Sequence, residues 1–359
     1  MARVKRKKFI LFSYSSIPSY TANSIAVMNF CNELNKICDL TVVCIKNKKI
    51  DESYINFYKV EKMNLILLPK FFLKFHYLFF KIFALIICLL KGPDIIFSRD
   101  IVISYFLTRF KKRNVFELHQ IKQNGNNYYT KNFERMLKYI VSKKQLKHLV
   151  VISDSLKKDC IDYGINSQKI IVANSGVRND FFKLKLSNNK NILYLGSLQK
   201  GKGINNIIKL ANKLRNYNFF IIGGYKSEID KQIPNNIIHK PWVRPSEVLK
   251  NVDNIDYALM LFDNQDYKFY SPLKLFEYMA MGKIVFASNI IGINDIVIDG
   301  YNGFLVNPND INLLIEKIIM ISKNDKLKEY ISNNAKKTAK KYTWEKRAKY
   351  LLEVFNDDR

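Results

Sequence analysis

Short apolar runs alternate with longer amphipathic stretches along the whole chain. In the first half, runs that predict β-strands lie at 9–14, 40–45, 65–68, 94–97, 115–118, 149–152 and 170–172. Helical patterns separate most of these runs, for example at 24–34, 71–91 and 131–143. Because short apolar strands with helices between them form parallel βαβ units, the first half predicts a parallel sheet buried on both faces.

A polar segment, KLKLSNNKN at 183–191, interrupts this alternation. A second series of strands follows at 192–195, 219–222, 237–239, 257–261 and 284–287, and the chain ends on long helices. The pattern predicts an α/β protein of two Rossmann-like, doubly wound domains, 1–186 and 187–342, facing across a cleft. Ligands of such sheets bind beyond the carboxyl ends of the strands, so candidate site residues should follow the strands.

The most apolar stretch is FFLKFHYLFFKIFALIICLL at 71–90. Lys74, His76 and Lys81 interrupt it, and the uninterrupted part at 82–90 is shorter than the ~20 residues that span a bilayer. Three interpretations stay open. The stretch is a crossover helix packed on a sheet, or such a helix that also enters a membrane surface, or a true span.

The charge balance changes the picture of the partners. The chain has 59 Lys and Arg against 31 Asp and Glu, a formal net charge of +28. Such a balance favours polyanionic partners, namely nucleic acid, anionic lipid or phosphorylated substrates, although abundant Lys, Asn and Ile also fit a biased base composition. The five cysteines are scattered without metal or disulfide spacing, which indicates a reduced, cytosolic protein. The apolar run after the basic start breaks at Ser13, so it predicts a strand and not a signal peptide.

The first candidate site is the stretch NILYLGSLQKGKG at 191–203. Gly196, Gly201 and Lys202 have the spacing of a phosphate-binding P-loop, but Gly203 stands where such a loop needs Ser or Thr for magnesium. A helical pattern follows at once, and the beginning of a helix attracts phosphate. The loop is therefore either a diphosphate site that works without magnesium or a plain turn with a solvated lysine.

The second candidate is SPLKLFEYMAMGK at 271–283. Ser271 is predicted as the N-cap, Pro272 as the first helical residue and Gly282 as the residue after the C-cap. The free N–H groups at this helix start form a second anion site. Glu277 lies one turn further on, where its carboxylate can accept hydrogen bonds from a ribose diol, unless it is an ordinary surface glutamate.

Other candidates follow strands of the first half. Glu117 and His119 lie two residues apart at the end of a predicted strand and so share one face of it. Arg99 ends the neighbouring strand, where a solvated arginine is the alternative. The loop after the first strand, PSYTANSIAVMNF at 18–30, lacks G-x-G-x-x-G, which removes support for a hydride-transfer enzyme.

Motifs in a consistent order now carry a resemblance to a family. The sequence resembles the group 1 retaining glycosyltransferases of family 4, with the GT-B fold. SPLKLFEYMAMGK followed by DGYNGFLV is the most specific match. The supporting motifs, which span nearly the whole chain, are SYTANS, FSRD, FELH, VVISDSLKKD, IIVANSGV, YLGSLQKGKGI, FFIIGG, GINDIVIDGYNGFLV and YTWEKRA.

The resemblance implies roles for the candidate residues. It implies that Lys202 contacts the donor diphosphate, that Glu277 binds the ribose and that His119 lies near the transferred sugar. It also implies a last helix at 343–359 that packs back on the first domain, and no bound metal or other cofactor. The other expected substrate-binding residues are Asn23, Ser24, Arg99 and Glu117 on the acceptor side, and Ser197, Gly224, Ser271, Leu273 and Lys274 in the second domain.

Two positions depart from the family pattern. Phe269 stands where the first glutamate of the E-x7-E motif belongs, which removes the carboxylate usually aimed at the sugar ring. Ser197 stands where the arginine that partners the lysine belongs, and Lys200 or Lys274 is expected to compensate.

The sequence therefore predicts a retaining, metal-independent glycosyltransferase that uses a nucleotide sugar. The expected acceptor is a saccharide, lipid-linked, in the synthesis of bacterial capsule or lipopolysaccharide. The apolar helix at 71–90 and the basic start at 3–8 predict a cytoplasmic protein peripheral to the anionic inner membrane. Alternatives are a sugar-nucleotide epimerase of the same fold and a basic nucleic-acid-binding protein, although no nucleic-acid-binding motif is present. Gly203 argues against a P-loop NTPase.

Overall fold

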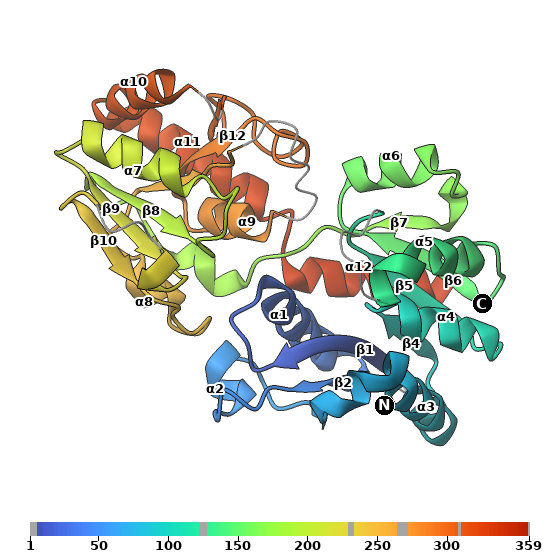
Figure 1. The fold of residues 1–359 in the computed structure, drawn as a ribbon. Coiled ribbons are helices and arrows are strands. Elements are labelled where there is room, and N and C mark those ends of the chain that lie inside the picture. The colour runs from blue at the N-terminus through green and yellow to red at the C-terminus, as the bar shows by residue number, and fades with distance from the viewer. Residues whose placement is uncertain (1–5, 122–127, 229–232, 264–271, 308–309, 358–359) are drawn as a thin grey trace, which may run out of the picture. The chain divides into compact units, whose positions relative to one another are not determined.

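All strand pairs among the described residues are parallel, and they form two sheets (Figure 1). The computed structural model describes residues 6–121, 128–228, 233–263, 272–307 and 310–357. The chain divides into unit 1, Met1–Asn174 with Trp344–Arg359, and unit 2, Ser175–Thr343. The sequence analysis placed the first boundary later, at 186. The residues between pack with unit 2, where Phe181 lies in the core and Val177 pairs with Thr343.

Unit 1 contains a seven-stranded sheet in the order β3-β2-β1-β4-β5-β6-β7. Its strands are β1 (Lys8–Ile17), β2 (Asp39–Lys46), β3 (Asn64–Leu68), β4 (Ile95–Ser98), β5 (Asn114–Leu118), β6 (Leu146–Val151) and β7 (Ile170–Val172). Its helices are α1 (Ala22–Ile37), α2 (Tyr54–Tyr58), η1 (Lys70–Leu73), α3 (Lys74–Lys91), α4 (Ile101–Arg109), α5 (Tyr128–Val141), α6 (Asp154–Asp162), η2 (Ser167–Lys169) and α12 (Trp344–Asp357).

Unit 2 contains a six-stranded sheet in the order β10-β9-β8-β11-β12-β13. Its strands are β8 (Asn191–Leu195), β9 (Asn218–Ile222), β10 (Ile237–Lys240), β11 (Tyr257–Met260), β12 (Ile284–Ser288) and β13 (Phe304–Val306). Its helices are η3 (Asn179–Lys183), α7 (Ile204–Lys213), η4 (Lys226–Glu228), α8 (Val248–Asn251), α9 (Leu273–Ala280), α10 (Ile311–Ser322) and α11 (Asp325–Ala339).

The strand order places a switch point in each sheet. The order reverses between β1 and β4 in unit 1, and between β8 and β11 in unit 2. Connections leave in opposite directions at such a point, which opens a crevice at the carboxyl ends of the two strands. Strands β5, β11 and β12 are buried along their whole length, as expected for parallel strands that helices cover on both faces.

Helix α3, the apolar stretch of the sequence, is a crossover helix that packs on the sheet of unit 1. Phe80, Ala84, Ile87 and Cys88 lie in a core cluster with residues of β1, β2 and β4. This confirms the crossover helix on a sheet, which the first two interpretations share. Within the described part of the chain, no helix is both long enough and apolar enough to cross a bilayer.

Helix α12, the last element of the chain, belongs to unit 1 (Figure 1). It packs along α1, where the rings of Trp344 and Phe30 lie 6.4 Å apart. Phe355 reaches Phe97 on β4, with ring centroids 6.3 Å apart. The C-terminal helix therefore contributes directly to the core of unit 1, beside the strands that carry Arg99 and Glu117.

Candidate functional site

The loop after β8 lies at the switch point of unit 2 and is pressed against the end of β11. Gly203 has a φ of +71°, and a Cβ there would lie 2.7 Å from Leu261 Cβ and 2.8 Å from its carbonyl oxygen. Only glycine allows this approach. The Gly201 N–H donates to Asp263 Oδ2 at 3.0 Å, and the Asp263 N–H donates to the Gly201 carbonyl at 3.3 Å. These contacts fix the loop beside the residues that follow β11.

Lys202 lies between these two glycines. Its Nζ is 5.0 Å from the centroid of the Phe262 ring. Helix α7 begins at Ile204, and its N-cap, Gly203, makes no side-chain capping hydrogen bond. An ammonium group and the beginning of a helix therefore share one short loop, which is a favourable environment for an anion.

The loop after β9 closes against the same loop. Gly223 and Gly224 have φ values of +119° and +65°. A Cβ on Gly223 would collide with the Gly196 carbonyl, and a Cβ on Gly224 would collide with Leu198. The glycines of both loops thus let two backbones pack directly on one another at the carboxyl edge of the sheet.

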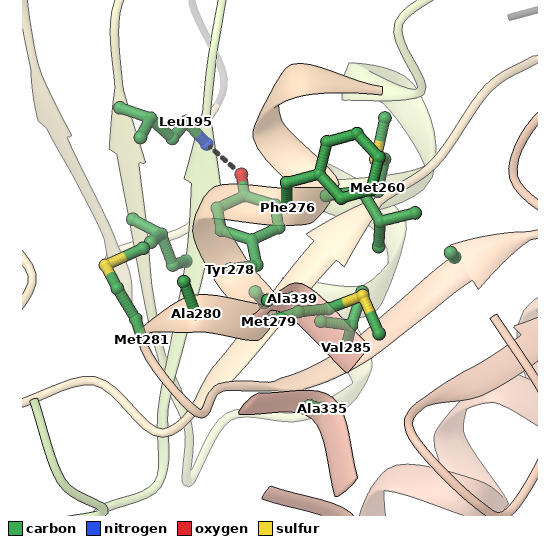
Figure 2. Packing of buried hydrophobic residues seen from close by; sticks show 14 of the residues in the cluster. Leu195, Met260, Phe276, Tyr278, Met279, Ala280, Met281, Val285, Ala335 and Ala339 are labelled. Carbon is green, nitrogen blue, oxygen red and sulfur yellow. Dashed lines mark hydrogen bonds between the residues drawn. The ribbon is translucent and has the colours of Figure 1, made fainter. Parts of the chain in front are cut away.

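Helix α9 is tied to the end of β8 by one buried hydrogen bond. The ladder between β8 and β11 ends at Leu193, so the Leu195 N–H, which faces β11, has no ladder partner there. The Tyr278 hydroxyl accepts this N–H at 2.8 Å, as Figure 2 shows. Phe276, Met279 and their neighbours pack around this bond in the core of unit 2 (Figure 2). The bond fixes α9 relative to the strand that leads into the glycine loop.

The ends of α9 match the sequence prediction in part. The helix begins at Leu273, and Pro272 is the N-cap and not the first helical residue, because its ψ of 61° is not helical. Ser271 and Phe269 lie outside the described residues. Gly282 is confirmed as the residue after the C-cap: its φ is +70°, its N–H donates to the Met279 carbonyl, and the next N–H donates to Tyr278.

Glu277 is not an ordinary surface glutamate. It is buried on α9, and Lys274, one turn earlier, donates to its Oε2 at 2.8 Å. The partly exposed ammonium group of Lys274 neutralises this carboxylate near the start of the helix. The pair presents a cation and two carboxylate oxygens in the first turns of α9.

Unit 1 has its own polar cluster at the carboxyl ends of β4 and β5. The Glu117 side chain is only 3% exposed, and it lies between two guanidinium groups. Arg99 Nε is 3.0 Å from its Oε1, and Arg347 Nη2, from α12, is 2.6 Å from its Oε2. Arg347 also donates to the carbonyls of Ala173 and Asn174. The C-terminal helix thereby clamps the end of β5.

His119 is the exposed member of this cluster. Its side chain is 36% exposed, and its Nε2 lies 2.8 Å from Glu117 Oε1 and 2.8 Å from Arg99 Nη2. The partial burial of the ring and the positive charge of Arg99 lower the pKa of His119, against the opposing hydrogen bond of Glu117. Burial alone would raise the pKa of Glu117, but Arg99, Arg347 and His119 outweigh it and hold that pKa well below its usual range. The cluster therefore presents a neutral imidazole over an ionised, fully paired carboxylate.

The residues around Arg99 fix its position, both in its own chain segment and at the start of α1. Asp100 is the N-cap of α4, where its Oδ1 accepts the N–H groups of Val102 and Ile103. Arg99 Nη1 donates to the Asn23 carbonyl at 3.5 Å. Asn23, Arg99, Glu117 and His119 are thus brought together around the switch point between β1 and β4.

Comparison with known proteins assigns unit 2 to a family. Residues 177–338 match the model of the family described as glycosyl transferases group 1. This segment belongs to the group 1 glycosyltransferases. An uncharacterized glycosyltransferase of Methanocaldococcus jannaschii is 24% identical over 318 residues, which cover 79% of each chain. The capsular polysaccharide biosynthesis glycosyltransferase CapM of Staphylococcus aureus is 26% identical over 223 residues, 55% of each chain.

The solved structures extend the likeness to the whole chain. Anabaena HepE, in a complex with UDP and glucose, has a TM-score of 0.78 at 14% identity. The superposition covers 98% of this chain and 99% of HepE. At this identity the likeness shows the fold, which confirms the predicted GT-B class. The resemblance to group 1 glycosyltransferases, read first from sequence motifs, is confirmed as well.

The structure places the expected residues of the two units unevenly. Lys202, Ser197, Gly224, Leu273, Lys274 and Glu277 all belong to the loops and helix at the carboxyl edge of the sheet of unit 2. In unit 1, Ser24, Arg99 and Glu117 were expected to line the acceptor side. All three are buried, and their part in binding an acceptor stays a prediction. The Ser24 hydroxyl donates to the Ser16 carbonyl, so its side chain serves the start of α1 instead.

The sequence analysis missed two residues that hold the site. Tyr278 was read only as part of a helical motif, and Arg347 only as part of YTWEKRA. Local periodicity cannot reveal either, because each acts on a residue far away in the chain. Among the described residues no group of three or more His, Cys, Asp or Glu side chains gathers as a metal site requires. That the enzyme works without a metal stays a prediction.

Proposed function

We propose that the protein is a retaining glycosyltransferase that transfers a sugar from a nucleoside diphosphate sugar to a saccharide acceptor. The observation that carries the donor assignment is the loop at the switch point of unit 2. There Gly203 packs on Leu261, Lys202 lies over Phe262, and α7 begins without a side-chain cap. The match to group 1 glycosyltransferases and the UDP bound to HepE support a nucleotide sugar as the donor.

The chemistry follows from where charge develops. When the bond between the anomeric carbon and the diphosphate breaks, the diphosphate leaves with additional negative charge. An ammonium group and helix N–H groups already aimed at that position stabilise the departing group most at that moment. Lys202 and the starts of α7 and α9 supply those groups in this proposal, and Glu277 accepts hydrogen bonds from the ribose. Residues 264–271, which include Ser271, lie outside the described structure.

The acceptor is assigned by likeness to relatives. CapM, a capsular polysaccharide biosynthesis glycosyltransferase, supports a saccharide acceptor in the assembly of a bacterial surface polysaccharide. That this acceptor is linked to a lipid is part of the proposal. In unit 1 the exposed imidazole of His119, held by Glu117 and Arg99, is the group proposed to meet the sugar. Asn23, beside Arg99, is the proposed contact to the acceptor.

A panel of nucleotide sugars tests the donor assignment. A donor at a hundred times its Kd should add ~2.7 kcal/mol to the free energy of unfolding. The matched donor, incubated with an acceptor in EDTA, should give a product whose anomeric configuration NMR shows unchanged. A new nucleotide sugar formed without any acceptor would indicate an epimerase instead. Absence of stabilisation by every nucleotide sugar would overturn the proposal.

A further inference from the structure

Helix α3 has a second apolar face that the protein leaves uncovered. Its core face carries Phe80, Ala84, Ile87 and Cys88. On other sides of the helix, large apolar side chains are exposed at helical spacing, and the preceding η1 adds one more. We call this set the α3 face: Phe71, Leu78, Phe79, Ile82, Ile86, Leu89 and Leu90.

The exposure is greatest at the C-terminal end of the helix. Leu89 is 62% and Leu90 is 81% exposed. Isolated exposed leucines are ordinary, but a row of seven large apolar residues over one helix and its lead-in marks an interaction surface. Helix α4, which packs beside α3, ends on another exposed ring, Phe110.

Cations lie close to the α3 face, and the stretch that carries it has no carboxylate. No Asp or Glu occurs between positions 62 and 93, whereas exposed lysines lie at both ends of the row, at 70 and 91. The Lys8 ammonium donates to the Lys91 carbonyl at 3.3 Å, and Lys112 is close enough to Cys88 to lower the pKa of its thiol, although burial raises that pKa overall. Cations therefore lie at both ends of the apolar row, with one acidic residue, Asp94, beside Lys8.

An apolar row with cations beside it favours one kind of partner over another. A second copy of the chain would place the same cations opposite one another, because a two-fold interface pairs a patch with itself. An anionic lipid surface instead accepts the apolar side chains at its acyl boundary and the ammonium groups at its phosphates. We propose that the α3 face docks unit 1 onto an anionic membrane surface, with α3 lying in the interface. This goes beyond the proposed function, since it needs no donor and no catalysis.

Vesicle co-sedimentation of the full chain tests the proposal. The protein should bind vesicles of phosphatidylcholine with phosphatidylglycerol and bind phosphatidylcholine alone weakly. Leu89→Ser with Leu90→Ser should lower the partition coefficient at least about tenfold, since two inserted side chains are lost. Lys70→Gln with Lys91→Gln should lower it by a similar factor and flatten its dependence on salt.

Matched controls separate this surface from general effects. Ile298, which is 59% exposed, and Met320, which is 50% exposed, lie in unit 2, and Ile298→Ser with Met320→Ser should leave vesicle binding unchanged. Equal binding by the Leu89/Leu90 variant and the wild type overturns the proposal. So does a wild-type dimer that this variant splits into monomers without any vesicle binding, because the α3 face would then be an interface between copies. Stabilisation of the variants by nucleotide sugars, measured in parallel, tests the proposed function separately from membrane binding.

Discussion

Replacing Arg347 by methionine removes one of the two cations that hold the buried carboxylate of Glu117. Methionine retains much of the apolar stem that packs in α12, where the guanidinium lies 5.0 Å from the Phe30 ring centroid. The change therefore leaves Glu117 with Arg99 and His119 but without its shortest ion pair, 2.6 Å from Arg347 Nη2. The carbonyls of Ala173 and Asn174 lose a donor at the same time.

The loss of stability on replacing Arg347 follows from the burial of its ion pair with Glu117. Both side chains are under 5% exposed, so water does not replace the lost partner. Breaking such a buried pair costs about 3–5 kcal/mol. For a unit of this size that corresponds to a fall of about 6–20 °C in Tm. Lys349→Met on the same helix is the matched control, because its pair with Glu345 is exposed to water and such surface pairs contribute little to stability.

Urea unfolding of both variants, each in a Trp242→Phe background so that Trp344 in α12 gives the tryptophan signal, measures the two losses of stability. The pH adds a second readout. The folded pKa of Glu117 is depressed, so its stabilisation is complete above the unfolded pKa of about 4.3 and is lost as the pH falls toward the folded pKa. Arg347→Met raises the folded pKa, so acid unfolding should begin at a higher pH. If Arg347→Met lowers the free energy of unfolding no more than Lys349→Met does, and both variants have the same acid midpoint, then Arg347 does not pair with Glu117.

Three further variants test the fixed parts of the site. Gly203→Ala forces a Cβ against Leu261 and should lower stability by about 1–3 kcal/mol and weaken nucleotide binding. Gly201→Ala is the control and should lower stability less, because no atom lies within 4 Å of its Cβ. Equal denaturation midpoints for the two variants would contradict the close packing. Tyr278→Phe leaves a buried N–H at the end of β8 unpaired and should cost about 1–3 kcal/mol in urea unfolding, while a change below about 0.5 kcal/mol would mean that the bond is not formed. Burial raises the pKa of Asp100 to about 6, so the wild type loses stability as the pH rises from about 4 to 6. Asp100→Asn retains a capping side chain and should be the more stable protein at pH 7.5 but not at pH 4; a difference independent of pH would refute the raised pKa.

The strand predictions from the sequence succeeded because buried parallel strands are continuous apolar runs. All twelve predicted runs correspond to strands of the structure, and the sheet order then follows from the rule for doubly wound sheets. Strand β13 (Phe304–Val306) was missed, since three residues after the turn at DGYNG form too short a run. The pairing of β13 with β12 stabilises it as a strand, and this pairing cannot be read from the sequence of β13 alone.

The candidate site divides in the same way. Glycines with positive φ and the lysine between them have a local cause and were found, as was Glu277 on its helix. The partners that fix these groups are distant in sequence: Tyr278 reaches back to Leu195, and Arg347 reaches back to Glu117. No spacing rule connects such pairs, so the sequence could name the residues near the ligand but not those that hold them.

Binding of UDP to Lys202→Ala tests the central claim most directly, that the loop at 196–203 holds the donor diphosphate. Isothermal titration should show a loss of about ten- to a hundredfold in affinity, as expected for one charge-assisted hydrogen bond of about 1.5–3 kcal/mol, with the Tm of the ligand-free protein nearly unchanged. Lys209→Ala, which removes an exposed lysine of α7, should bind UDP like the wild type. Equal UDP affinity for Lys202→Ala, Lys209→Ala and the wild type would contradict the account.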